Sequence, residues 1–189
     1  MNTKRSCGVL LPLFSLPSEH GIGTLGKAAY DFIDFLAAAG QSWWQLLPVG
    51  PAGSGDSPYN SFSSFAGNAY CIDLDMLVQD GLLTKAEVSA VDWGNDEQSV
   101  DYEKLRAHRM PLLRKAARRG LEKNAEEFDS FCRDNASWLS DYALYMALKE
   151  HFGGASWTEW PEDIRLHRAE AVEKYRSELA SDVRFYSYV

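Results

Sequence analysis

The stretch between residues 53 and 70, GSGDSPYNSFSSFAGNAY, carries the side chains best suited to bind a ligand. It holds five serines and four aromatic rings, and Asp56 is its one charged residue. Sugars present apolar C–H faces and a rim of hydroxyl groups, so aromatic rings beside polar side chains can bind both features. Tyr59 follows Pro58, which fixes the turn and biases Ser57 toward an extended conformation. These residues predict a carbohydrate-binding loop.

The same composition permits a second interpretation, in which the rings pin a long loop onto the protein core. The four rings are those of Tyr59, Phe62, Phe65 and Tyr70. A stretch that combines rings and hydroxyl groups is consistent with a binding site, but this composition alone does not establish one. The two interpretations differ in whether Tyr59 faces solvent or the core, and both stay open at this point.

Two pairs of residues have the types needed for acid–base chemistry. Glu19 precedes His20 in a glycine-containing loop, and such a pair could act as general acid and base. Polar residues at the surface are the more common account of this pattern. Asp73 and Asp75 would share one face of a strand, or one of them would cap a helix that begins around Met76. We assign no catalytic residue from these pairs.

Two further motifs resemble binding sites but favour simpler interpretations. GIGTLG, residues 21–26, has the glycine spacing of a dinucleotide-binding loop, but residues 45–49 offer no acidic partner at the end of a second strand. A cluster of basic residues on a predicted helix is followed closely by glutamates, which indicates a solvated helix face. The basic residues are Arg114, Lys115, Arg118 and Arg119.

The elements that position the loop are predicted to be a strand, a helix and a strand. The apolar runs at 7–13 and 42–49 read as buried strands. Between them, residues 24–40 read as a helix with Thr24 as the N-cap and Gly40 as the stop signal. Its apolar stripe would consist of Ala28, Phe32, Phe35, Leu36 and Ala39.

Short connections between these elements favour a parallel βαβ unit. Loops that leave the carboxyl ends of parallel strands open on one side of the sheet, where ligands bind in barrels and open sheets. The loop after the second strand is the ring-bearing stretch. Trp43 and Trp44 are adjacent on that strand, so we expect them to point to opposite faces.

The rest of the chain reads as helices. Residues 1–74 contain eight charged side chains, and the remaining residues are far richer in charge, as is typical of solvated helices. Thr84 and Asp101 are predicted to start helices, Pro111 to kink or divide one, and Gly153 with Gly154 to end another. A last helix is expected from residue 168 to the end of the chain.

Composition excludes several classes of protein. The 189 residues include 46% hydrophobic and 13% aromatic side chains, which is typical of a globular protein. A net charge of −8 argues against binding to nucleic acid or to an anionic membrane. Three scattered cysteines predict neither a disulfide framework nor a metal site, and they fit a reducing, cytoplasmic compartment. No metal or organic cofactor is expected.

The N-terminal part resembles a known enzyme family. The segments GVLLPLFSLPSEHGIGTLG and WWQLLPVGPAGSGDSPYNSFSSFAGNAYCIDL are similar to the N-terminal part of 4-α-glucanotransferases, the amylomaltases or disproportionating enzymes of glycoside hydrolase family 77. The first 75 residues carry most of the resemblance. In the helical remainder, LKEHFGGASWTEWP is the most similar piece.

The resemblance implies an α/β fold, the N-terminal part of a (β/α)8 TIM barrel followed by a mostly helical insertion. Residues 1–75 would hold the first two strands, the first helix and the substrate loop, and residues 76–189 the insertion. The barrel would be incomplete, because a whole one takes about 250 residues. The chain is therefore expected to be a fragment of a longer protein.

The resemblance also implies a reaction. The family transfers a segment of an α-1,4-glucan to the 4-hydroxyl of another glucose or maltooligosaccharide by a retaining mechanism, which needs two carboxylates about 5 Å apart. Tyr59 would line the sugar site next to the scissile bond, with Ser57 and Asp56 beside it. The catalytic carboxylates would lie beyond Val189, so the chain alone is expected to be inactive. The alternatives are a non-catalytic glucan-binding module and a helical interaction protein.

Overall fold

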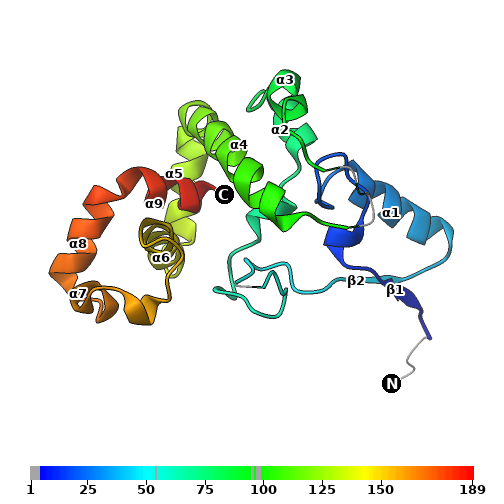
Figure 1. Cartoon of the computed structure of the whole chain (residues 1–189). Helices are drawn as coiled ribbons and strands as arrows, with labels where there is room; N and C mark the ends of the chain where they lie inside the picture. The colour runs from blue at the N-terminus through cyan, green and yellow to red at the C-terminus, as the bar shows by residue number, and fades with distance from the viewer. Residues whose placement is uncertain (1–4, 54, 95, 97–98) are drawn as a thin grey trace. The chain divides into compact units, whose positions relative to one another are not determined.

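The chain folds into two compact units, residues 1–116 and 117–189. The computed structural model describes residues 5–53, 55–94, 96 and 99–189 (Figure 1). The boundary between the units falls inside helix α4 (Tyr102–Lys123). The predicted division near residue 75, between a barrel start and a helical insertion, stays a prediction.

The first unit begins with the predicted strand–helix–strand order. Strand β1 (Gly8–Leu10) pairs in parallel with β2 (Trp43–Gln45), with Gly8 opposite Trp43. Helix α1 (Lys27–Ala38) connects the two strands (Figure 1). A Cβ atom on Gly8 would lie 2.4 Å from the Trp43 carbonyl oxygen, so glycine permits the close approach of the strands.

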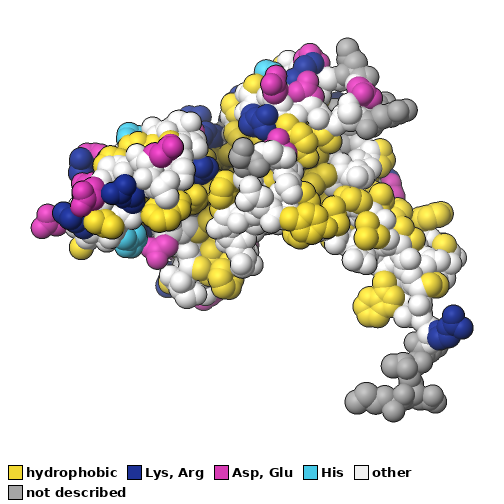
Figure 2. All heavy atoms as spheres, turned by 60° about the horizontal axis from the view of Figure 1, so that its bottom comes forward, with side chains coloured by type: hydrophobic (Ala, Val, Ile, Leu, Met, Phe, Trp, Pro, Cys, Tyr) yellow, Lys and Arg dark blue, Asp and Glu magenta, His cyan; other side chains and the backbone are white. Residues whose placement is uncertain are grey.

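The prediction that both strands are buried is wrong for the described chain. Leu10 is 55% exposed and Trp43 is 66% exposed, whereas Trp44 packs edge-on against Phe32 of α1, with ring centroids 5.0 Å apart. The two tryptophans therefore point to different surroundings, as predicted. A two-stranded sheet buries side chains only where another element covers it, and α1 covers one face. Figure 2 shows hydrophobic side chains at the surface over the part of the first unit that holds the strands.

Helix α1 differs from the prediction at its start and along its apolar stripe. Its N-cap is Gly26, not Thr24. The buried Thr24 hydroxyl donates a 2.5 Å hydrogen bond to Asp73, so a tertiary contact replaces the expected cap. Leu36 is buried as predicted, but Phe35 is exposed and Ala29, which was not in the predicted stripe, is buried. Gly40 follows the helix at φ +70°, which confirms the predicted stop.

The core of the first unit lies under β1 and α1, and short helices complete the unit. One cluster of this core consists of Leu13, Leu16, Ala29 and Cys71, with Leu11, Phe14, Ala28, Phe32 and Trp44 packed against it. The short helices are η1 (Leu13–Ser15), η2 (Ala69–Cys71), α2 (Leu74–Gln79) and α3 (Lys85–Ser89).

The predicted helix starts are confirmed by their hydrogen bonds. The Asp73 carboxylate accepts from the Met76 N–H at the start of α2, and the Asp101 carboxylate accepts from the Lys104 N–H at the start of α4. Pro111 lies inside α4 without dividing it, so the predicted division there is wrong.

Thr84 caps α3 through a reciprocal pair of hydrogen bonds. Its hydroxyl accepts from the Glu87 N–H, and the Glu87 carboxylate accepts from the Thr84 N–H at 2.9 Å. We expect Thr84→Ala to lower the free energy of unfolding of the first unit by about 1 kcal/mol, because the Glu87 N–H loses its partner. Urea denaturation followed by circular dichroism measures the change. Thr84→Ser keeps the hydroxyl and should unfold like the parent; an equal loss in both variants would contradict the capping role.

The second unit is helical throughout its regular elements. These elements are α5 (Ala125–Asp134), α6 (Leu139–His151), η3 (Trp157–Glu159), α7 (Glu162–Arg165), α8 (Ala169–Glu178) and α9 (Ala180–Tyr188). Its core consists of Leu144, Leu148, Trp160, Ile164, Ala171 and Tyr175. Gly153 and Gly154 have positive φ and follow α6, which confirms the predicted end of that helix. The single last helix expected from the sequence is in fact two, α8 and α9, which meet at Leu179.

None of the helices that the structure describes is both long enough and apolar enough to cross a membrane.

Candidate functional site

A closed loop follows β2 at the start of the ring-bearing stretch, and we name its described residues, 51–53 and 55–61, the aromatic loop. Ala52 and Ser61 form an antiparallel bridge at its base. The Gly53 N–H donates to the Asn60 carbonyl at 2.7 Å. A Cβ on Gly53 would lie 2.9 Å from the Asn60 side chain, so the two sides of the loop meet closely at this glycine. The backbone of the loop is therefore fixed at its base.

Tyr59 lies in a turn in which the Asn60 N–H donates to the Ser57 carbonyl, and it is 74% exposed. Its N–H lies 3.4 Å from the Ser57 hydroxyl, which accepts from it, and Ser57 itself is half-buried. Phe65 is also exposed, whereas Tyr70 is half-buried. The interpretation that all four rings pin the loop onto the core is therefore wrong for Tyr59 and Phe65. An exposed ring beside a hydroxyl group has the surface that a sugar face requires.

Asp56 is the third residue predicted to bind substrate, and the structure pairs it with an arginine. Both of its carboxylate oxygens accept from Nη1 of Arg106, at 3.1 and 3.0 Å. Asp56 has φ +54°, a left-handed conformation that aspartate tolerates better than most residues. The structure thus brings Ser57 and Tyr59 next to an ion pair that joins the aromatic loop to α4.

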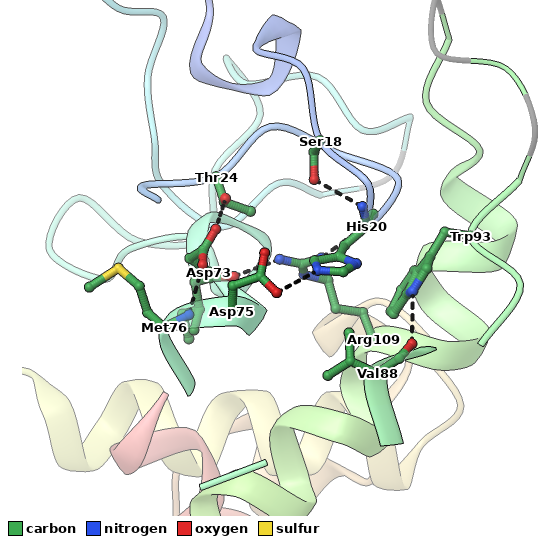
Figure 3. A network of polar contacts seen from close by, with 10 residues as sticks. Ser18, His20, Thr24, Asp73, Asp75, Met76, Val88, Trp93 and Arg109 are labelled. Carbon is green, nitrogen blue, oxygen red and sulfur yellow. Dashed lines mark hydrogen bonds and ion pairs between the residues drawn. The ribbon is translucent and has the colours of Figure 1, made fainter. Parts of the chain in front are cut away.

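A second polar network involves the loop that follows β1 (Figure 3). Its centre is Arg109 of α4, whose side chain is fully buried. Nη1 donates to the His20 carbonyl at 3.2 Å, and Nη2 donates to the Ile72 carbonyl at 2.5 Å. The Trp93 ring lies against the guanidinium, 6.0 Å from centroid to Cζ. Arg109 therefore joins three segments that are distant in the sequence.

Burial sets the electrostatics of this network. It lowers the pKa of Arg109 to about 10, because an apolar surrounding disfavours the charged form, and Asp73 opposes the shift. Burial also raises the pKa of the Cys71 thiol to about 11, so this thiol is not an activated nucleophile.

The predicted acid–base pairs separate in the structure. The His20 ring nitrogen Nε2 contacts Asp75 at 3.1 Å (Figure 3). Glu19 is exposed in the loop. Asp73 binds the Thr24 hydroxyl and caps α2, so it does not act with Asp75. These contacts agree with the structural roles that the sequence favoured over catalysis.

The basic cluster and the glycine motif also have structural accounts. Lys115 pairs with Glu87 at 3.1 Å, and Arg118 is exposed on α4. Gly23 and Gly26 of the glycine motif pack where a Cβ would overlap the backbone of residues 13–16 and the Asp73 side chain. Packing, and not phosphate binding, explains these glycines.

Metal binding has no candidate site in the described part of the chain. Across residues 5–53, 55–94, 96 and 99–189, no group of three or more His, Cys, Asp or Glu side chains is placed to hold a metal ion. Cys7, Cys71 and Cys132 are free thiols.

Comparison with known proteins identifies the family. Residues 11–189 match the model of the 4-alpha-glucanotransferase family. A 4-alpha-glucanotransferase of Streptococcus pneumoniae serotype 4 is 49% identical over 185 residues, which cover 97% of this chain and 37% of that protein. The chain belongs to the 4-alpha-glucanotransferase family. A member from Thermus thermophilus is 44% identical over 192 residues, which cover all of this chain and 37% of that protein.

A solved structure agrees with this family membership. The amylomaltase from Streptococcus agalactiae in complex with acarbose superposes with a TM-score of 0.93 at 38% identity, covering 97% of this chain and 38% of that one. The resemblance seen in the sequence is therefore confirmed. The chain spans a little over a third of the length of these members of the 4-alpha-glucanotransferase family.

Sequence reasoning missed the two arginines at the centre of these two sets of polar contacts, Arg106 and Arg109. Arg106 and Arg109 lie one turn apart on α4, in the stretch RAHR. Their partners Asp56, Ile72 and His20 lie 50, 37 and 89 residues away in the sequence. No local pattern signals such contacts.

Proposed function

We propose that residues 1–189 form part of a 4-alpha-glucanotransferase, which transfers a segment of an α-1,4-glucan to the 4-hydroxyl of another glucose or maltooligosaccharide. Family membership supports the reaction, and a structural neighbour was solved with acarbose bound. The observation in this chain that carries the proposal is the exposed Tyr59 ring, in a turn where the Ser57 hydroxyl accepts from the Tyr59 backbone N–H. Ser57 and Tyr59 then form one wall of the glucan site, with Asp56 beside them.

The fold supports the same proposal. β1, α1 and β2 would be the start of a (β/α)8 barrel in residues 1–75, and residues 76–189 would be its helical insertion. The aromatic loop leaves the carboxyl end of β2, the end at which barrel enzymes bind their substrates. The partners would be maltooligosaccharides or starch-type glucans, and the location would be the cytoplasm, to which three free thiols are suited.

Catalysis in this proposal uses residues outside the chain. A retaining transferase needs a nucleophilic carboxylate and an acid–base carboxylate about 5 Å apart. Asp56 pairs with Arg106 and Asp73 caps a helix, so neither is assigned such a role. The contribution of residues 1–189 is to bind and orient the glucan.

Tyr59 gives the direct test of glucan binding. We expect Tyr59→Ala to weaken the affinity of the chain for maltoheptaose about tenfold, because a sugar face covering about 50 Å² of ring contributes roughly 1.3 kcal/mol. Calorimetric titration measures the change. Tyr59→Phe keeps the ring and should retain most of the affinity. Tyr30→Ala removes an exposed tyrosine of α1 and should change nothing.

Transfer is tested in a chimera in which residues 1–189 replace the matching region of the Streptococcus pneumoniae relative. The chimera should release glucose from maltotriose, and Tyr59→Ala should reduce kcat/KM by a similar factor. Binding of glucan by the chain without transfer by the chimera would favour the non-catalytic binding module. Wild-type affinity in Tyr59→Ala would overturn the assignment of the loop.

A further inference from the structure

An ion pair joins the turn of the aromatic loop to α4, in addition to hydrogen bonds within the turn such as that from the Asn60 N–H to the Ser57 carbonyl at 3.1 Å. Hydrogen bonds between its two sides fix the base of the loop. At the turn, the Asp56 N–H makes a 3.3 Å contact with the Gly53 carbonyl, and Asp56 has a left-handed backbone. This conformation is an uncommon one for a non-glycine residue, so a contact that holds the Asp56 side chain also holds the turn.

Arg106 supplies that contact from a well-anchored helix. Its Nη1 reaches both carboxylate oxygens of Asp56, at 3.1 and 3.0 Å. The neighbouring Leu105 and Arg109 of α4 are buried, so the backbone that carries Arg106 is fixed. The Asp56 side chain is 25% exposed and that of Arg106 is 53% exposed. The pair is therefore partly shielded from solvent on the side of the loop.

Asp56 interacts electrostatically with two half-buried tyrosines. Burial raises the pKa of Tyr70 and of Tyr102, and the charge of Asp56 acts on both hydroxyl groups. The hydrogen bond to Asp56 raises the pKa of Arg106 further above its ordinary value. Ser57 follows Asp56 directly and Tyr59 lies three residues after it, so the ion pair holds the backbone that leads into both residues.

We propose that Arg106 is a positioning residue for glucan binding: it holds Asp56, and through Asp56 it holds Ser57 and Tyr59 in the binding conformation. The proposal rests on the proposed function of the aromatic loop. It gives the Asp56 carboxylate a role in holding the loop, in place of a direct contact with sugar.

The test is a double-mutant cycle on the affinity of the chain for maltoheptaose. Arg106→Gln and Asp56→Asn each remove one charge, and asparagine tolerates the left-handed backbone of residue 56. We expect each variant to bind about fivefold more weakly and the double variant to bind no more weakly than either. Hydrogen exchange of residues 51–61 should increase in all three. Lys104→Gln is the matched control and should bind maltoheptaose like the parent. Lys104 lies on the same helix as Arg106 and makes an ion pair with Asp92.

Salt concentration supplies a readout that a purely structural role would not change. Maltoheptaose carries no charge, so its affinity should be insensitive to salt unless an ion pair holds the site. We expect the parent to bind about threefold more weakly in 1 M NaCl, where the Debye length is about 3 Å, and Arg106→Gln to show no salt effect. Arg106→Lys keeps the charge and should recover part of both the affinity and the salt effect.

Each outcome separates this inference from the proposed function. Parent-like affinity in Arg106→Gln would overturn the positioning role. Losses that multiply in the double variant would also overturn it, because Asp56 would then act on the sugar independently. If Tyr59→Ala binds maltoheptaose like the parent, the proposed function of the loop fails first.

Discussion

Replacing Arg109 by alanine is expected to lower the free energy of unfolding of the first unit by about 3 kcal/mol. The guanidinium is fully buried and donates to the carbonyl oxygens of His20 and Ile72. Each buried carbonyl that loses its donor costs about 1–3 kcal/mol. Burial lowers the pKa of Arg109, which shows that burying this charge is itself unfavourable. Removal of the charge therefore recovers part of the lost free energy of unfolding.

Urea denaturation and hydrogen exchange measure the effect and its location. Exchange should increase in peptides covering residues 15–24 and 70–76, and not in residues 139–151 of the second unit. Arg109→Met fills the space without donating hydrogen bonds. Its free energy of unfolding should therefore lie between those of Arg109→Ala and the parent. Arg118→Ala removes an exposed arginine of the same helix and should change the free energy of unfolding by less than about 0.5 kcal/mol. A loss below about 1 kcal/mol in Arg109→Ala would contradict the role of the arginine as a link between segments.

Local signals in the sequence predicted those parts of the fold that depend on neighbouring residues. Asp73, Thr84 and Asp101 start helices because their side chains reach an N–H three residues ahead. The order and parallel pairing of the two strands were also predicted. The extent of the strands was not: each has three residues, although the apolar runs are longer. A strand extends only as far as a neighbouring strand pairs with it, and an apolar run in the sequence does not show where that pairing ends.

Contacts between distant segments explain the errors. Thr24 has the side chain of an N-cap, but Asp73 lies 49 residues away in the sequence and takes its hydroxyl. In the candidate site, Tyr59 was found because rings and hydroxyl groups gather in one stretch. Arg106 was missed because it lies 50 residues from Asp56. The residues proposed to face the ligand were therefore visible in the sequence, and the arginine proposed to hold them required the structure.

Gly23 shows how a motif can mislead, and it carries the second large expected effect. A Cβ built on Gly23 would lie 2.2 Å from the Leu13 carbonyl oxygen and 2.8 Å from that of Leu16. These oxygens belong to the backbone of η1 and of the residue that follows it. Rotation of a side chain therefore cannot relieve the overlap with the new Cβ. We expect Gly23→Ala to lower the free energy of unfolding of the first unit by about 3 kcal/mol, at the upper end of the cost of overpacking.

Gly67→Ala is the matched control for this substitution. A Cβ on Gly67 meets nothing within 4 Å, and its φ does not lie in the left-handed region. This variant should unfold within about 0.5 kcal/mol of the parent, or slightly later, because alanine restricts the unfolded chain. Exchange of the Leu16 N–H, which donates to the Leu13 carbonyl at 3.1 Å, should increase in Gly23→Ala alone. If both variants unfold like the parent, the loop after η1 accommodates a Cβ more easily than its contacts indicate. Close packing would then not explain the glycines of the motif.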